Sequence, residues 1–191
     1  MPRIDAPTVA EHHAQRRAAL LAAAEELLAE QGVEAVTPAA VGARAGLARS
    51  SVYQYFSSSP AIVAAVVEDA FPRATEQLRA AMADARTPGE QVDAYVRTAL
   101  SLADDRTHRS LRALSGADLP EECRSRMDEL HRAQTAPLVD ALSALGTPDA
   151  ALTARLVGGV VRAAAQAVAE GAPAARVTRR TLALIHEGIG A

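Results

Sequence analysis

Apolar residues return along most of the chain every three or four positions, which is the repeat of one helix face. One such stripe is Leu20, Leu21, Ala24, Leu27 and Leu28, and a second is Leu138, Val139, Leu142 and Leu145. No run alternates apolar and polar residues with the period of two that a half-buried strand shows. The pattern therefore predicts only helices, over residues 12–31, 38–45, 49–55, 60–85, 88–104, 107–116, 120–145, 149–170 and 175–188.

Hydroxyl side chains, prolines and glycines mark where these helices begin and end. A Ser or Thr followed directly by Pro, or by Glu three positions later, is typical of a helix start, and a Gly closing an apolar repeat is typical of a helix end. The predicted caps are Thr8, Thr37, Ser59, Thr87 and Thr147, and the predicted ends are Gly32, Gly116, Gly146 and Gly171. Pro72 and Pro137 fall inside predicted helices, where the missing N–H is expected to kink or break them.

The composition favours the same fold class and raises one objection about partners. Forty-six of the 191 residues are Ala, whereas Trp is absent and there are only two Phe and three Tyr. Because Ala is the best helix former and a poor strand residue, we expect an all-α protein. All 20 cations are Arg, the formal net charge is −3 and the isoelectric point is about 6.0. That average charge argues against a nucleic-acid-binding protein.

Membrane, secretion and metal signals point to a cytoplasmic protein without a cofactor. Arg155, Arg162 and Gln166 interrupt the longest apolar stretch, which falls short of the 18 or so apolar residues of a membrane span. The first residues lack the basic start and apolar run of a signal peptide. Cys123 is the single cysteine and cannot form an internal disulfide. Its spacing to His131 does not fit a metal site, so we expect no bound metal.

Residues 37–56 read TPAAVGARAGLARSSVYQYF, which predicts a helix-turn-helix. Thr37 and Pro38 begin a first short helix, Gly46 lies in the turn, and Val52 faces inward from a second short helix. The residues left for the outer face of that second helix are Arg49, Ser50, Ser51, Tyr53 and Tyr55. An Arg fork matches the edge of guanine, and hydroxyls donate to phosphates. The alternative is a helical corner in a protein that does not bind DNA.

The order of residues through this segment resembles the N-terminal DNA-binding domain of TetR-family transcriptional regulators. The resemblance covers residues 16–67 and is carried by Arg17, Leu21, Ala23, Ala24, Leu27, Leu28, Gln31-Gly32, Val36-Thr37, Val41, Ala45-Gly46-Leu47, Ser51-Val52-Tyr53-Gln54-Tyr55-Phe56 and Ile62. It implies an N-terminal three-helix DNA-binding domain followed by a helical ligand-binding and dimerisation domain. The DNA-binding residues that it implies are Thr37, Pro38, Arg49, Ser50, Ser51, Tyr53, Tyr55 and Ser59.

The sequence departs from the family pattern at three positions. Ser59 stands where the family usually has a Lys that holds a phosphate, and Pro60 stands where an acidic residue usually follows. Gly42 replaces a customary Ala. Ser59 can still cap its helix and donate a hydrogen bond to a phosphate. Because it brings no charge, we expect weaker and less salt-sensitive DNA binding.

The distribution of charge answers the objection raised by the net charge. Residues 35–67 contain Arg44 and Arg49 and no acidic residue, and a dimer doubles this local surplus. Arg3, Arg16 and Arg17 could add contacts with phosphates or the minor groove. Since the local sign of charge matters more than the total for a surface that meets a polyanion, we expect a thin basic surface at the DNA.

The last two predicted helices are expected to form a dimer interface. The helix over 149–170 is apolar round most of its circumference and must be buried on several sides. The resemblance implies that it pairs with a second copy in a symmetric dimer. The expected interface residues are Leu152, Leu156, Gly159, Val160, Ala163, Ala167, Leu182 and Ile185. The alternative is that these residues form the core of a monomer.

The resemblance also implies a pocket for a small-molecule effector between about residues 88 and 145. The candidate ligand-binding residues there are Tyr95, His108, Arg109, Arg112 and His131. Arg109 and Arg112, three residues apart, could face a carboxylate, although such a pair is more often solvated surface. The sequence does not identify the effector.

Together these features predict a ligand-responsive bacterial repressor that binds a palindromic DNA operator as a homodimer. The expected domains are a flexible arm over 1–11, the DNA-binding domain over 12–58 and the effector-binding and dimerisation domain over 59–191. Effector binding is expected to change the separation of the two recognition helices, which must match half-sites about 34 Å apart. No Gly-rich phosphate loop, GxSxG or HExxH motif is present, so we expect no catalytic residue. A helical protein-interaction module is the alternative.

Overall fold

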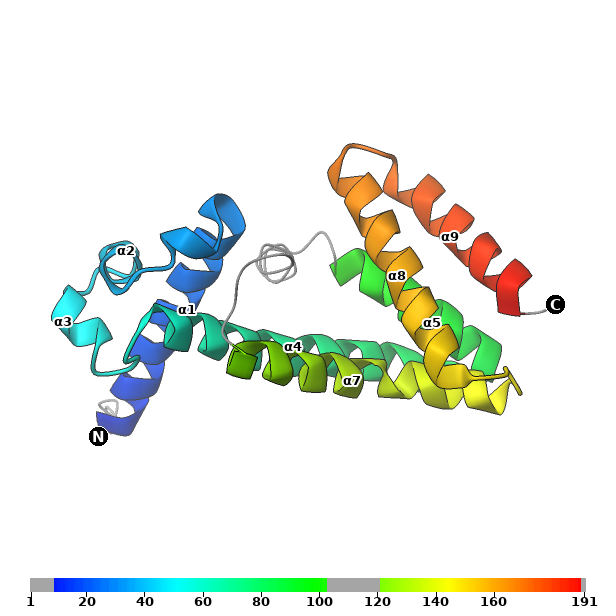
Figure 1. The fold of residues 1–191 in the computed structure, drawn as a ribbon, viewed down its shortest axis with the longest axis horizontal. Helices are drawn as coiled ribbons and strands as arrows, with labels where there is room; N and C mark the ends of the chain where they lie inside the picture. Colours follow the sequence, from blue (N-terminus) through cyan, green and yellow to red (C-terminus); the bar gives the residue numbers. More distant parts are fainter. Residues whose placement is uncertain (1–8, 103–120, 190–191) are drawn as a thin grey trace, which may run out of the picture. The chain divides into compact units, whose positions relative to one another are not determined.

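The computed structural model describes residues 9–102 and 121–189, which form helices joined by short turns (Figure 1). In chain order these are α1 (Val9–Gln31), the short 3₁₀ helix η1 (Val33–Ala35), α2 (Pro38–Arg44), α3 (Arg49–Val52), α4 (Ser59–Ala83), α5 (Pro88–Leu102), α7 (Glu121–Ala144), α8 (Ala150–Ala169) and α9 (Ala174–Ile189). Within these two ranges no residue lies in a strand, and the predicted all-α fold is confirmed. The helix predicted over 107–116 lies outside the described residues. None of the described helices is long and apolar enough to cross a membrane.

Two helix boundaries near the N-terminus differ from the predicted ones. α1 begins at Val9, three residues earlier than expected, with Glu11 in its first turn, where a carboxylate stabilises the positive end of the helix dipole. α3 ends at Val52 and does not continue to residue 55. The backbone then tightens into a turn in which the N–H of Tyr55 donates to the carbonyl of Val52 at 2.9 Å, a spacing of three residues.

Two helices continue through a proline. Pro72 lies inside α4 and Pro137 inside α7, so of the predicted kink or break the break does not occur. A proline removes one backbone hydrogen bond from its helix. Ala70 and Ala74, on either side of Pro72, are both buried, so packing on this face holds the helix together across the missing bond.

The caps of α4 and α8 are not the predicted ones. Ser58 caps α4, since its Oγ accepts a hydrogen bond at 3.2 Å from the backbone N–H three residues on, and Ser59 is the first helical residue. Asp149, not Thr147, caps α8, because its carboxylate accepts the N–H of Leu152 at 3.1 Å. A carboxylate is a stronger cap than a hydroxyl next to the positive end of a helix.

The described helices belong to two compact units. Unit 1 holds α1, η1, α2, α3 and the beginning of α4 up to Glu68. Unit 2 begins at Asp69 and holds the rest of α4 together with α5, α7 from Arg124, α8 and α9. Residues 121–123, at the start of α7, belong to unit 1. α4 and α7 therefore each have residues in both units.

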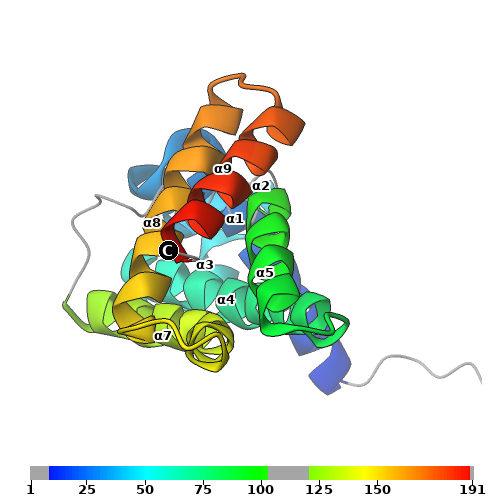
Figure 2. The same cartoon turned by 90° about the vertical axis from the view of Figure 1, so that its right-hand side faces the viewer.

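The core of unit 2 is built by one face of each of its helices. It includes Leu78 of α4, Tyr95 of α5, Leu138 of α7 and Val157 of α8, all buried. α5 packs against both α8 and α9, which lie side by side (Figure 2). A hydrogen bond also joins α5 to α9, with 2.7 Å between the Asp93 carboxylate and Nε2 of the His186 ring.

Candidate nucleic-acid interface

The α2–α3 corner in unit 1 is held by a cap, a left-handed glycine and buried apolar residues. Thr37 caps α2 as predicted, accepting the N–H of Ala40 at 3.2 Å. Gly46 lies in the turn with a φ of +69°, a conformation that residues with a side chain rarely adopt. Val41 of α2 and Val52 of α3 are fully buried, which fixes the second helix against the first.

Gly42 allows the two helices of the corner to approach closely. Its carbonyl accepts the N–H of Leu47 at 2.8 Å. A Cβ added at Gly42 would lie 2.8 Å from the carbonyl oxygen of Leu47 and 3.0 Å from Cγ2 of Val52. The glycine noted as a departure from the family pattern is therefore required by the packing of this corner.

The outer face of α3 presents the residue types that the sequence predicts. Arg49 and Ser50 are exposed, Ser51 is half-buried and Tyr53 is 46% exposed. Nη2 of Arg49 donates a hydrogen bond to the Tyr53 hydroxyl at 3.1 Å, and the guanidinium carbon lies 5.6 Å from the centre of the Tyr53 ring. The two side chains thus form one exposed pair along the helix.

The N-terminal half of α1 lies beside the end of this corner. The ring of His13 packs on the half-buried ring of Tyr55, with 4.4 Å between ring centres. The guanidinium of Arg17 lies 5.8 Å from the centre of the buried Phe56 ring. Local sequence does not show that His13 touches the helix-turn-helix, because this contact depends on how α1 crosses the corner.

Two predicted DNA-binding residues lie in places that change their role. Pro38 is buried at the first position of α2. We therefore assign it to helix initiation, in place of the predicted DNA contact. Ser59 is half-buried in the first turn of α4 and does not cap that helix, because Ser58 does. Its contact with a phosphate stays a prediction.

The positive charge of the corner is smaller than the sequence suggests. Nη1 of Arg44 lies 2.8 Å from Glu30 and 3.6 Å from Glu26, both on α1. The hydrogen bond from Arg44 to Glu30 raises the pKa of the Arg44 guanidinium. Of the two cations between residues 35 and 67, Arg44 is thus balanced by carboxylates of another helix, and Arg49 carries the exposed charge of α3.

Two of the five predicted effector-binding residues are described, and they lie on different helices of unit 2. Tyr95 of α5 is buried in the core, and this burial raises its pKa to about 12. His131 of α7 packs edge-on against the ring of Phe71, with 4.6 Å between ring centres. Desolvation lowers the pKa of His131, and the charge of Arg162 lowers it further. His108, Arg109 and Arg112 lie outside the described residues.

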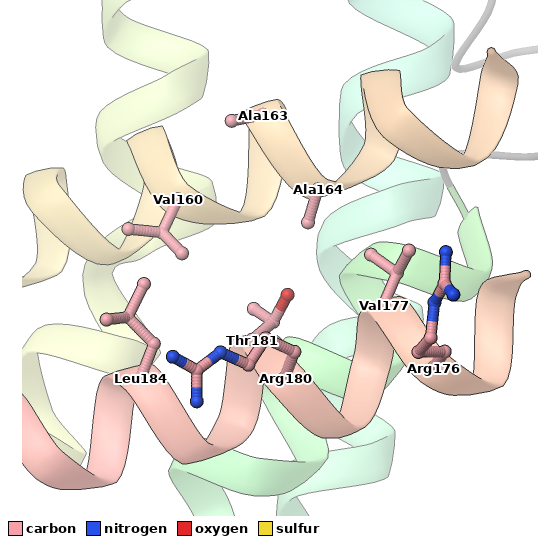
Figure 3. A pocket seen from close by; sticks show the side chains of 8 residues that line it. All are labelled: Val160, Ala163, Ala164, Arg176, Val177, Arg180, Thr181 and Leu184. Carbon is pink, nitrogen blue, oxygen red and sulfur yellow. The ribbon is translucent and has the colours of Figure 1, made fainter. Parts of the chain in front are cut away.

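Unit 2 also has a groove of about 480 Å³ between α8 and α9. Val160 of α8 and Leu184 of α9 point toward each other across it (Figure 3). Its lining consists of Val160, Ala163, Ala164, Arg176, Val177, Arg180, Thr181 and Leu184. Neither Tyr95 nor His131, the two candidate effector-binding residues that the structure describes, lines this groove.

An apolar stripe on α8 is exposed, as a dimer interface requires. Leu152 and Leu156 are 45% and 62% exposed, and Gly159 and Ala163 follow them on the same side of the helix. The two other α8 residues expected at the interface are half-buried; these are Val160 and Ala167. A Cβ added at Gly159 would meet no atom within 4 Å, so this side of the protomer is open.

The two α9 residues expected at the interface are not available to a partner. Leu182 and Ile185 are 6% and 4% exposed and belong to the core of unit 2, so we remove them from the predicted interface. Leu184, which the sequence analysis did not select, is 49% exposed instead. The apolar repeat of α9 identified residues that are buried by the protein's own helices.

The chain is similar to known proteins both in sequence and in structure. Residues 20–66 match the family model described as "Bacterial regulatory proteins, tetR family". The HTH-type transcriptional regulator BetI of Rhizobium meliloti is 33% identical over 82 residues, which covers 43% of this chain and 40% of BetI. The chain thus aligns with less than half the length of that curated relative.

Solved structures with the same fold cover nearly the whole chain. The regulator FadR from Bacillus subtilis, in complex with stearoyl-CoA, has a TM-score of 0.79 at 18% identity and covers 90% of this chain and 98% of its own. AibR, in complex with isovaleryl coenzyme A and operator DNA, has a TM-score of 0.76 at 17% identity and covers 88% of this chain and 97% of its own. At these identities the likeness establishes the fold that the chains share.

Proposed function

We propose that this chain is a TetR-family regulator, and that it acts as a ligand-responsive repressor that binds a palindromic operator as a homodimer. The observation that carries the proposal is the α2–α3 corner of unit 1. The family match over residues 20–66 spans this corner, and Arg49, Ser50 and Tyr53 are exposed on the outer face of α3. A short exposed helix of this kind fits the major groove of DNA.

In this proposal Arg49 reads a base edge, and hydroxyl groups hold the phosphates on either side. The guanidinium can give two parallel hydrogen bonds to guanine. Thr37, Ser50, Ser51, Tyr53, Tyr55 and Ser59 are the residues we assign to sugar and phosphate contacts. These contacts fix the register of the protein on the duplex, whereas Arg49 supplies the sequence preference.

A selection of bound sequences from random duplex DNA tests the proposal. The expected result is enrichment of a palindrome whose half-sites are about one helical turn apart. Arg49→Ala should lower affinity for the enriched sequence by about 1–3 kcal/mol. Arg44→Gln is the matched control, because it removes the same charge from the same segment but not from the outer face of α3. If the wild-type protein enriches no sequence, the helical protein-interaction module becomes the better assignment.

The exposed stripe of α8 and the groove beside it support the homodimer. A palindromic operator requires two copies related by a two-fold axis. Leu152, Leu156 and Leu184 are large apolar side chains, between 45% and 62% exposed, and the groove is lined mainly by apolar residues. A second copy of the same face would bury these side chains in an isologous contact.

We assign the effector site to unit 2, and acyl-coenzyme A thioesters are the first effectors to test. Two structural neighbours are named for complexes with stearoyl-CoA and isovaleryl coenzyme A. Effector binding would act on the DNA-binding helices through α4, which runs from unit 1 into unit 2. Release of the selected DNA by an acyl-CoA, but not by coenzyme A alone, would support this assignment. We propose in addition that the protein acts in the cytoplasm and has no catalytic activity.

A further inference from the structure

Arg49 and Tyr53 lie four residues apart on α3 and the turn that follows it, on the same exposed side. One N–H of the Arg49 guanidinium is already bonded to the Tyr53 hydroxyl at 3.1 Å. The guanidinium also lies beside the Tyr53 ring, 5.6 Å from its centre. Arg49 is therefore restrained by a residue of its own helical turn before any DNA is bound.

We propose that Tyr53 is a positioning residue that sets the base preference of Arg49, an inference that rests on the proposed DNA-binding function. A guanidinium carries five N–H donors in one plane. The bond to Tyr53 uses one of them, which leaves enough donors for the two parallel bonds that a guanine edge accepts. Because the guanidinium contacts both the hydroxyl and the ring of Tyr53, these contacts favour one orientation of the remaining donors.

The hydroxyl of Tyr53 can serve both Arg49 and the DNA backbone. It accepts the hydrogen bond from Arg49 and keeps its own proton to donate to a phosphate oxygen. The chain of contacts would then run from phosphate through Tyr53 and Arg49 to a base. A long Arg side chain loses rotamer freedom when it binds, and the bond to Tyr53 removes part of that freedom in advance.

A simple phosphate contact by Tyr53 makes a different prediction from a positioning role. A phosphate contact carries no sequence information, so its loss weakens binding to all sequences equally. Loss of a positioning contact lowers the preference at the one base position that Arg49 reads. Tyr53→Phe separates the two roles, because it removes the hydroxyl and keeps the exposed ring that borders Arg49.

The experiment begins with selection from random DNA by wild-type protein and by Arg49→Ala. The base position at which Arg49→Ala loses its preference is the one that Arg49 reads. Affinities of wild type, Tyr53→Phe and the double variant are then measured on the selected duplex and on duplexes changed at that position. Tyr53→Phe is expected to reduce discrimination there by roughly 3- to 30-fold, and to have a smaller effect when Arg49 is already Ala.

Tyr55→Phe is the matched control, since it removes a hydroxyl from a neighbouring tyrosine whose ring packs on His13 and not on Arg49. It should weaken binding to all sequences alike. If Tyr53→Phe does the same, and its effect adds to that of Arg49→Ala, Tyr53 is a phosphate contact and the inference is wrong. The inference is also wrong if the wild-type protein enriches a sequence but Arg49→Ala loses its preference at no base position of that sequence. In that case the proposed function stands. If wild type enriches nothing, the proposed function and this inference fail together.

Discussion

Gly42 is the residue at which the backbone of α2 leaves least room for a side chain. The Cβ that Gly42→Ala adds would lie 2.8 Å from a backbone oxygen, that of Leu47, which cannot move without shifting the turn before α3. We expect Gly42→Ala to lower the free energy of unfolding of unit 1 by about 1–3 kcal/mol. Urea unfolding followed by tyrosine fluorescence measures this change.

Gly158 of α8 provides the control for that substitution. A Cβ added there would meet no atom within 4 Å, and alanine is favoured over glycine inside a helix by about 1 kcal/mol. Gly158→Ala should therefore leave stability unchanged or raise it. Equal destabilisation by the two substitutions would show that the close approach at Gly42 is not the cause.

Tyr95 makes the stability of unit 2 sensitive to alkaline pH. Burial raises its pKa from 10.0 to about 12 in the folded protein. Its contribution to stability is complete below pH 10 and is lost as the pH rises from about 10 to about 12, because the unfolded chain ionises first. We expect Tyr95→Phe to reduce the loss of stability in that window, by up to roughly 1.4 kcal/mol per pH unit.

Urea midpoints at pH 9, 10 and 11 test this expectation. Tyr53→Phe is the control, since it removes the same hydroxyl from a tyrosine that is 46% exposed and lies in unit 1. Wild type and Tyr95→Phe losing the same stability between pH 10 and 11 would contradict the prediction.

At single positions, the sequence predicts which type of residue is used better than it predicts which hydrogen-bond partner that residue has. The capping pair of α5 is as predicted, with the N–H of Glu90 bonded to the Thr87 hydroxyl at 3.2 Å and the Glu90 carboxylate bonded back to Thr87. The cap of α4 was placed one residue late, on Ser59. Three consecutive serines precede Pro60, and each has the hydroxyl that a cap needs, so only the path of the backbone selects Ser58.

At the level of the helices, the contact of α1 with α2 determines how much positive charge the α2–α3 corner exposes. Arg44 of α2 meets Glu26 and Glu30, which are four residues apart and thus on one side of α1. Local sequence shows an acid-free segment from residue 35 to residue 67. It does not show that carboxylates from the preceding helix reach into that segment, because this depends on how the two helices cross.

Glu30→Gln is expected to raise the affinity of the protein for DNA. The substitution removes the carboxylate 2.8 Å from Arg44, so more of the Arg44 charge can interact with phosphates. The slope of log affinity against log salt concentration should become steeper by up to about one, because one more phosphate contact releases one more counterion. DNA titrations at several salt concentrations measure both effects.

Glu34→Gln serves as the control, because it removes the same charge from the exposed surface of η1, just after α1. Any general effect of net charge should be the same in both variants. If Glu34→Gln strengthens DNA binding as much as Glu30→Gln does, the ion pair with Arg44 does not limit the charge of the corner.

For the whole molecule, the face of α8 that carries Leu156 is predicted to hold two copies together. Leu156→Arg places a charge at the centre of the exposed stripe, where burial against a partner would be costly. We expect the variant to be monomeric with unchanged helix content, and to lose affinity for a palindrome far more than for a single half-site. Sedimentation and DNA titration measure these outcomes.

Ala151→Arg is the matched control for the dimer. Ala151 is exposed on the side of α8 that also carries Arg155 and Arg162, away from Leu156. The same charge at this position should leave the dimer intact. A dimer that survives Leu156→Arg, or that is lost equally in both variants, would place the interface elsewhere.

The sequence predicted the fold class and the location of the α2–α3 corner because both depend on local repeats and short motifs. It did not separate the residues of α9 that face the protein's own core from those that face outward. Leu182 and Leu184 are both apolar and two positions apart, yet one is 6% and the other 49% exposed. An apolar repeat indicates that a face is buried, and only the tertiary arrangement decides what buries it. The domain boundaries and the effector site stay predictions.

Pro72 has a consequence for the cooperativity of unfolding. It lacks the N–H that would bond to the carbonyl of Glu68, and Glu68 is the last residue of α4 that belongs to unit 1. The backbone ladder of α4 is thus weakest where one unit passes into the next, and we expect the units to melt in separate transitions. The three tyrosines report on them individually, because Tyr53 and Tyr55 lie in unit 1 and Tyr95 lies in unit 2. In Tyr95→Phe the remaining tyrosine fluorescence follows unit 1 alone.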